Sequence, residues 1–104
     1  MIKSASVSEL KDWLDAGHAM LVDVREPDEY QAGHIKGSTL MPLAQISLGA
    51  LPPYQRKKLV MQCRSGGRSR TACTKLIAEQ PDIEIYNLEG GFLAWKEAGY
   101  EVSH

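Results

Sequence analysis

A cysteine beside glycines and arginines is the feature of this sequence with the clearest capacity for chemistry. The segment reads Cys63-Arg64-Ser65-Gly66-Gly67-Arg68, and Ser69 follows it. An ordinary thiol has a pKa of about 8.5, so only a few per cent of it is ionised at neutral pH. A nucleophilic thiolate therefore needs stabilisation from its surroundings.

Three features near Cys63 could supply that stabilisation. Gly66 and Gly67 permit backbone conformations that turn several N–H groups inward as an anion-binding nest. A helix that begins near Arg68 would direct its free N–H groups and its positive dipole end at the same loop. The arginines at positions 64, 68 and 70 add positive charge. We therefore predict that Cys63 is a reactive, catalytic thiol.

We expect a structural role for the second cysteine. Cys73 lies on the side of a predicted helix that also carries Leu76 and Ile77, which favours packing in the core over a role as a resolving thiol. A disulfide with Cys63 is not expected in a reducing compartment. No metal site is predicted, because no Cys-x-x-Cys occurs and the histidines are not at paired ligand spacings.

The elements that must position Cys63 follow from the alternation of apolar runs and helical patterns. Strands are predicted at 20–24, 39–41, 58–62 and 83–86, and helices at 10–16, 28–32, 69–80 and 92–98. Residues 43–54 look irregular, with one weak helical turn. Such alternation implies an α/β fold with a mostly parallel sheet that helices cover on both faces. Ligands of these sheets bind beyond the carboxyl ends of the strands, and Cys63 falls at one such end.

Composition limits the classes of protein to consider. The chain has 104 residues, 12 Lys and Arg against 13 Asp and Glu, and 43% apolar residues. We predict one domain spanning 1–104, with enough apolar residues for a core of its own. A net charge of −1 argues against a nucleic-acid binder. No apolar run approaches the roughly 20 residues that cross a bilayer, and no secretory signal opens the chain, so a cytoplasmic protein is expected.

Four blocks of sequence resemble the rhodanese family in their order and spacing. They are Leu21–Glu26, Glu29–Ser38, Cys63–Ser69 and Leu88–Trp95, followed by Gly99-Tyr100. Together they cover about residues 5 to 102. The chain departs slightly from the family at Lys36 and Ser38, where Pro and Ala are frequent, and neither departure touches the chemistry.

The resemblance implies a three-layer α/β/α sandwich and a single-domain sulfurtransferase. Cys63 would take the outer sulfur of thiosulfate or a related donor as a persulfide, and pass it to cyanide in vitro or to a thiol or protein acceptor. Main-chain N–H groups of the loop would stabilise the sulfur anion, and Arg64 and Arg68 would attract the donor. The expected substrate-binding residues are thus Arg64, Ser65, Gly66, Gly67, Arg68 and Ser69. Neither a metal nor an organic cofactor is implied.

Four further residues are expected to support the site rather than to react. Asp23 and Arg25 end a strand on the side of the site, where we expect an ion pair and hydrogen bonds that fix neighbouring loops. His34 lies within a family block, and a structural role is favoured over a role in the site. Glu89 precedes Gly90-Gly91 and is predicted to anchor its loop, with an arginine as a candidate partner.

Two other functions compete with sulfur transfer. Cysteine phosphatases and arsenate reductases separate their cysteine and arginine by five residues, whereas four separate Cys63 from Arg68. The tighter cradle suits a single persulfide sulfur better than a tetrahedral phosphoryl group. The third possibility is a non-catalytic regulatory module of the same family, against which the retained Cys63 and its charged loop count.

Overall fold

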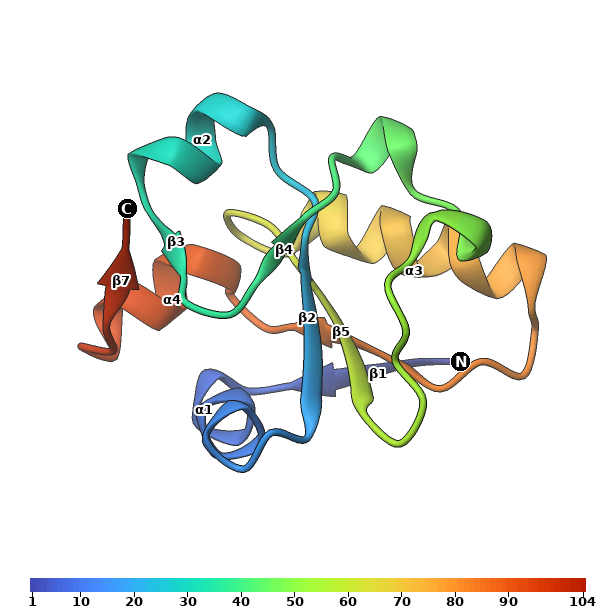
Figure 1. Cartoon of the computed structure of the whole chain (residues 1–104), viewed down its shortest axis with the longest axis horizontal. Coiled ribbons are helices and arrows are strands. Elements are labelled where there is room, and N and C mark those ends of the chain that lie inside the picture. The colour runs from blue at the N-terminus through green and yellow to red at the C-terminus, as the bar shows by residue number, and fades with distance from the viewer.

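A parallel five-stranded sheet forms the centre of the molecule (Figure 1). The computed structural model describes all residues, 1–104. Its strands are β1 (Ile2–Ala5), β2 (Ala19–Asp23), β3 (His34–Ile35), β4 (Thr39–Leu40), β5 (Lys58–Gln62), β6 (Ile85–Leu88) and β7 (Val102–Ser103). Its helices are α1 (Val7–Asp15), α2 (Pro27–Ala32), α3 (Gly67–Glu79) and α4 (Gly91–Glu97), with short 3₁₀ turns η1 (Leu43–Gln45) and η2 (Leu48–Ala50). The main sheet has the order β1-β6-β5-β2-β4, and β3 pairs with β7 in a small antiparallel sheet.

Strand β5 lies in the middle of the sheet and ends directly before Cys63. It pairs in parallel with β2 from Ala19↔Lys58 to Asp23↔Gln62, and with β6 on its other side. The last residues of β2 and β5 are therefore neighbours. This register brings Asp23 and Cys63 to the same, carboxyl edge of the sheet, where ligands of parallel sheets bind.

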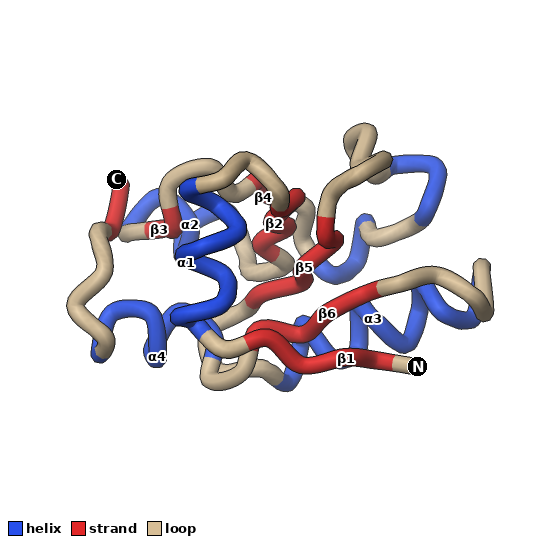
Figure 2. Tube along the Cα trace, turned by 90° about the horizontal axis from the view of Figure 1, so that it is seen from below, coloured by secondary structure: helices blue, strands red, loops and turns tan.

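Helices cover both faces of the sheet, so the molecule has the three layers expected from the sequence (Figures 1 and 2). One apolar cluster lies between the sheet and α3, and contains Val22, Leu59, Met61, Cys73 and Leu76. The other lies under α1 and α4, and contains Leu10, Leu21, Val60, Phe92 and Trp95. Successive residues of β2 and β5 thus enter opposite clusters, as in any strand buried on both faces. None of the helices combines the length and the apolar character needed to span a bilayer.

Most helices and strands lie close to where the sequence patterns predicted them. The strand at 58–62 is confirmed as predicted. At the start of α1, Ser6 and Glu9 form a capping box, in which each side chain accepts a hydrogen bond from the other's main-chain N–H. Helix α3 begins two residues earlier than predicted. Strand β6 covers 85–88 rather than 83–86, because Ile83 donates its N–H to the carbonyl of Gln80 in the turn after α3 and joins no strand.

Three short strands have no local signal in the sequence. The edge strand β1 has exposed polar residues at Lys3 and Ser4, and forms only because it pairs with β6. Strands β3 and β7 have two residues each and pair although residues 36–101, well over half of the chain, separate them. The irregular segment after β4 holds two 3₁₀ turns, η1 and η2, instead of the single weak turn expected.

Candidate active site around Cys63

The chain between β5 and α3 curls so that a main-chain amide faces the sulfur of Cys63. Gly66 is the N-cap of α3 and has a φ of +116°, a left-handed conformation that favours glycine. In this conformation the N–H of Gly66 donates a hydrogen bond to Cys63 Sγ at 3.1 Å. The glycine is therefore part of the anion-binding geometry and not only a turn former.

A buried serine completes the contacts of the sulfur. Ser69 Oγ lies 3.4 Å from Cys63 Sγ, 3.1 Å from the carbonyl oxygen of Gly66 and 2.5 Å from Asn87 Oδ1. Asn87 in turn donates from Nδ2 to the carbonyl of Gly66. A hydroxyl has one proton, so a protonated Cys63 can donate to Ser69 while Ser69 donates to Asn87, and after ionisation the hydroxyl can turn its proton to the sulfur.

These contacts favour the ionised form of the thiol. Burial raises the pKa of Cys63, but hydrogen bonds from the Ser69 hydroxyl and from the main-chain N–H groups of Ser69, Gly66 and Ser65 outweigh it. The net effect is a pKa of Cys63 below that of an ordinary thiol. Hydrogen bonds to the charged form of a group have this effect, and they would stabilise a persulfide anion in the same way.

Helix α4 fixes the backbone on which Cys63 sits. The N–H of Phe92 donates to the carbonyl of Cys63 at 2.8 Å, and the N–H of Leu93 donates to that of Arg64 at 3.0 Å. The contact is so close that a Cβ on Gly91, whose φ is +58°, would lie 2.4 Å from the Cys63 carbonyl oxygen. Only glycine fits at this position, which explains the second glycine of the Gly90-Gly91 pair.

Arg68 forms an ion pair instead of standing free in the loop. Its guanidinium donates to both carboxylate oxygens of Glu29 in α2, at 2.7 and 2.9 Å. The hydrogen bonds from Arg68 lower the pKa of Glu29 from 4.5 to about 2. The pKa of Arg68 is raised by Glu29, and to a smaller degree by the thiolate of Cys63. We predicted from the sequence that Arg68 attracts the anionic sulfur donor, whereas in the structure its Nη1 and Nη2 both donate hydrogen bonds to Glu29.

Asp23 and Arg25 form a buried ion pair at the end of β2. Arg25 donates from Nε and Nη2 to the carboxylate of Asp23, and from Nη2 to the carbonyl of Gly33 after α2. The guanidinium also stacks over the ring of Phe92 in α4, 4.4 Å from its centroid. This arginine therefore joins β2, α2 and α4, and all its contacts hold the walls of the site in place.

The remaining predicted residues lie away from the sulfur. The ring of His34 stacks on Tyr30, and its Nδ1 lies 2.9 Å from the Tyr30 carbonyl oxygen. Glu89 is exposed and takes part in none of the ion pairs; its loop is held by its main-chain N–H, which donates to the carbonyl of Ala5. Cys73 is fully buried against the sheet, and burial raises the pKa of its thiol to about 12.

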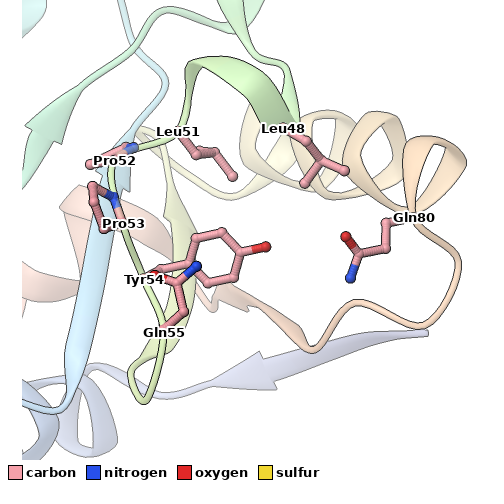
Figure 3. A pocket seen from close by; sticks show the side chains of 7 residues that line it. All are labelled: Leu48, Leu51, Pro52, Pro53, Tyr54, Gln55 and Gln80. Atoms are coloured by element: carbon pink, nitrogen blue, oxygen red, sulfur yellow. The ribbon is translucent and has the colours of Figure 1, made fainter.

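Two hollows open on the surface, and one of them adjoins the site. A recess of about 240 Å³, which we call the α2–α4 recess, lies beside residues 63–68, which we call the Cys63 loop. It is lined by Arg25, Arg64, Glu29, Phe92, Leu93, Lys96 and the end of α2. The other hollow, of about 360 Å³, lies at the far end of α3, among Leu48, Leu51, Pro52, Pro53, Tyr54, Gln55 and Gln80 (Figure 3). No charged residue lines this second hollow, whereas Arg25, Glu29, Arg64 and Lys96 line the α2–α4 recess.

The structure is that of an α/β protein with a parallel sheet, in which a main-chain amide donates a hydrogen bond to a cysteine sulfur at the carboxyl edge of the sheet. Residues 6–98 match the model of the rhodanese-like domain, and the chain belongs to this family. Thiosulfate sulfurtransferase GlpE of Pseudoalteromonas translucida is 32% identical over 96 residues, which cover 92% of this chain and 90% of that protein.

Solved structures agree with the family and with its architecture. A rhodanese-related protein from Thermoplasma volcanium superposes with a TM-score of 0.81 at 29% identity, and 97% of each chain is covered. A thiosulfate sulfurtransferase from Pseudomonas aeruginosa gives a TM-score of 0.87 at 27% identity; the match covers 99% of this chain and 20% of that one. The same domain thus also occurs within longer proteins.

Sequence reasoning missed two residues that shape the site. Asn87 is a polar residue in a strand whose neighbours Ile85 and Leu88 are fully buried, and a buried amide of this kind needs partners. That break in an apolar strand was a usable signal. Glu29 carried no such signal, because its partner Arg68 is 39 residues away and the two meet only in the folded chain.

Proposed function

We propose that this protein is a sulfurtransferase that carries a sulfane sulfur as a persulfide on Cys63. The observation that carries the proposal is the thiol itself, held at the carboxyl edge of the sheet by the Gly66 amide and the Ser69 hydroxyl, with its pKa lowered. The likeness to a thiosulfate sulfurtransferase along 92% of the chain supports thiosulfate as the donor.

The reaction proceeds in two displacements at sulfur. The Cys63 thiolate attacks the outer sulfur of thiosulfate, the S–S bond of thiosulfate breaks, and sulfite leaves with the electron pair. The acceptor, cyanide or a thiolate, then attacks the outer sulfur of the persulfide, and Cys63 leaves as a thiolate. The Cys63 thiolate and the persulfide intermediate both carry negative charge on sulfur, where the Gly66 amide and the Ser69 hydroxyl stabilise it. No general base is required, because the attack uses the thiolate form of Cys63, which these hydrogen bonds favour.

The loop supports sulfur chemistry over phosphoryl chemistry. A cysteine phosphatase uses the arginine of its loop to grip the phosphoryl oxygens, whereas Arg68 directs its donors to Glu29. The short spacing between Cys63 and Arg68 counts in the same direction. Turnover of an aryl phosphate by the protein, lost on changing Cys63 to Ser, would reverse this preference.

Intact-mass spectrometry tests the proposal directly. Incubation with thiosulfate should add one sulfur atom, about 32 Da, to the protein, and a peptide map should locate it at Cys63. Cys63→Ser should abolish both the adduct and thiocyanate formation. Cys73→Ser is the matched control, because it removes the other thiol of the chain. An unmodified Cys63, or an adduct confined to Cys73, would refute the proposed mechanism.

A further inference from the structure

The α2–α4 recess adjoins the Cys63 loop, and its volume is larger than a thiosulfate ion requires. One wall is Arg64, the residue directly after Cys63, and another is the start of α4, which is hydrogen-bonded to the carbonyls of both residues. Its volume of about 240 Å³ equals that of about eight water molecules at ~30 Å³ each. Thiosulfate is an ion of five non-hydrogen atoms, and only its outer sulfur has to reach the loop.

The charges that line the recess do not cancel. The guanidinium of Arg25 is neutralised by Asp23, and the carboxylate of Glu29 is neutralised by Arg68. Arg64 and Lys96 form no ion pair. Both are exposed at the mouth, so the recess presents two cations without a counter-ion.

Apolar surface lies beside these two cations. The ring of Phe92 lines the recess, with Lys96 Nζ 5.1 Å from its centroid. Leu93, next to it, is 37% exposed and is one of only two large apolar side chains exposed on the molecule. A ligand that suits this lining has a short aliphatic body and an anionic end.

We propose that the α2–α4 recess is the acceptor subsite of the sulfurtransferase and selects small thiols that carry a carboxylate. The carboxylate would lie between Arg64 and Lys96, and the aliphatic part against Phe92 and Leu93. This assignment rests on the proposed function, because it requires the Cys63 persulfide as the group that is handed over.

The transfer step balances as a displacement at sulfur. The acceptor thiol releases its proton to solvent, and its thiolate attacks the outer sulfur of the persulfide. The bond between that sulfur and Cys63 Sγ breaks, Cys63 takes the electron pair as a thiolate, and the acceptor leaves as a persulfide. The acceptor sulfur is oxidised and the Cys63 persulfide is reduced, so no further redox partner is needed.

A pair of acceptors with equal numbers of non-hydrogen atoms tests the subsite. 3-Mercaptopropionate carries a carboxylate, and 1-thioglycerol is neutral. With thiosulfate as donor, the measured quantity is the ratio of kcat/KM for 3-mercaptopropionate to that for 1-thioglycerol. Using the ratio removes any effect of a variant on persulfide formation itself, since both reactions start from the same loaded enzyme.

Substitution of Lys96 should change this ratio. Lys96→Met should lower it about threefold, the size of a partly exposed ion pair, and Lys96→Glu should lower it about tenfold by replacing attraction with repulsion. The matched controls are Lys57→Met and Lys57→Glu, which change the same charges in the turn before β5 and should leave the ratio as it is.

The outcomes separate the subsite from the proposed function. If thiosulfate does not load Cys63, no acceptor is turned over, and both proposals are overturned. If Cys63 is loaded and cyanide is converted to thiocyanate, but the ratio is the same in the Lys96 and Lys57 variants, only the subsite is overturned. A ratio that falls in the Lys96 variants alone supports the recess as the acceptor site.

Discussion

Replacing Gly91 with alanine tests how strictly the position of the Cys63 loop governs the proposed activity. The Cβ of an alanine would lie 2.4 Å from the carbonyl oxygen of Cys63 and 2.7 Å from that of Arg64, whereas ordinary contact begins at 3.4 Å. Both oxygens belong to backbone that cannot turn aside as a side chain can. The Cys63 carbonyl must therefore move by about 1 Å, or α4 must move away from it by as much.

The substitution has two costs, one in stability and one in rate, and they can be measured separately. An alanine with a left-handed φ costs about 1–2 kcal/mol in stability, wherever it stands. The displacement of the loop is an additional cost, and it falls on the reaction, since a misplacement of 1 Å can reduce a rate about 100-fold. We therefore expect Gly91→Ala to lose about two orders of magnitude in the rate of persulfide formation.

Gly17→Ala is the matched control for the strain alone. Gly17 has a φ of +73° at the end of α1, and nothing lies within 4 Å of the Cβ that alanine would add. This variant should lose about 1–2 kcal/mol in the free energy of unfolding and keep its rate. The assay is single-turnover reaction with thiosulfate, normalised to the folded fraction from urea unfolding. A folded Gly91→Ala that stays within threefold of the unmodified protein would refute the argument.

Three further outcomes are expected. Ser69→Ala removes a hydrogen bond to the thiolate worth about 1.5–3 kcal/mol, so the pKa of Cys63 should rise and alkylation at neutral pH should slow at least tenfold, whereas Thr74→Ala on the same helix should leave both unchanged. Cys73→Ser should keep most of the thiocyanate formation, because burial holds that thiol protonated with a pKa of about 12. Glu29→Gln should cost about 1 kcal/mol of stability at neutral pH. Because folding lowers the pKa of Glu29 from 4.5 to about 2, this difference in unfolding free energy is full above 4.5 and should vanish as the pH falls through 2.

The geometry of the Cys63 loop could be predicted from the sequence because its causes are local. A buried strand, two glycines and the start of a helix lie within about ten residues, and each has a signature of its own. The structure places the thiol and the amide of Gly66 together as those signatures require. The position of Cys73 in the core likewise follows from the side of the helix it shares with Leu76.

The partners of the loop could not be predicted, because they come from distant parts of the chain. Asn87 reaches Ser69 across 18 residues, and Glu29 reaches Arg68 across 39. Periodicity describes which face of an element is buried, but not which element covers it. The sequence therefore indicated that arginines lie near Cys63, but not which of them forms an ion pair with a carboxylate from a distant part of the chain.

This difference changes the account of how the thiolate is stabilised. The sequence offered three sources of stabilisation, namely loop amides, the start of a helix and arginines, and the largest contributions that lower the pKa of Cys63 are hydrogen bonds from Ser69, Gly66 and Ser65. Arg68 is held by Glu29, and Arg25 by Asp23. Main-chain amides cannot be turned away by a competing carboxylate, and they are screened less by salt than exposed guanidinium groups. If the amides carry the stabilisation, raising the salt concentration should raise KM for the anionic donor and leave the midpoint of Cys63 alkylation against pH nearly unmoved. A midpoint that rises steeply with salt would show instead that the arginines stabilise the thiolate.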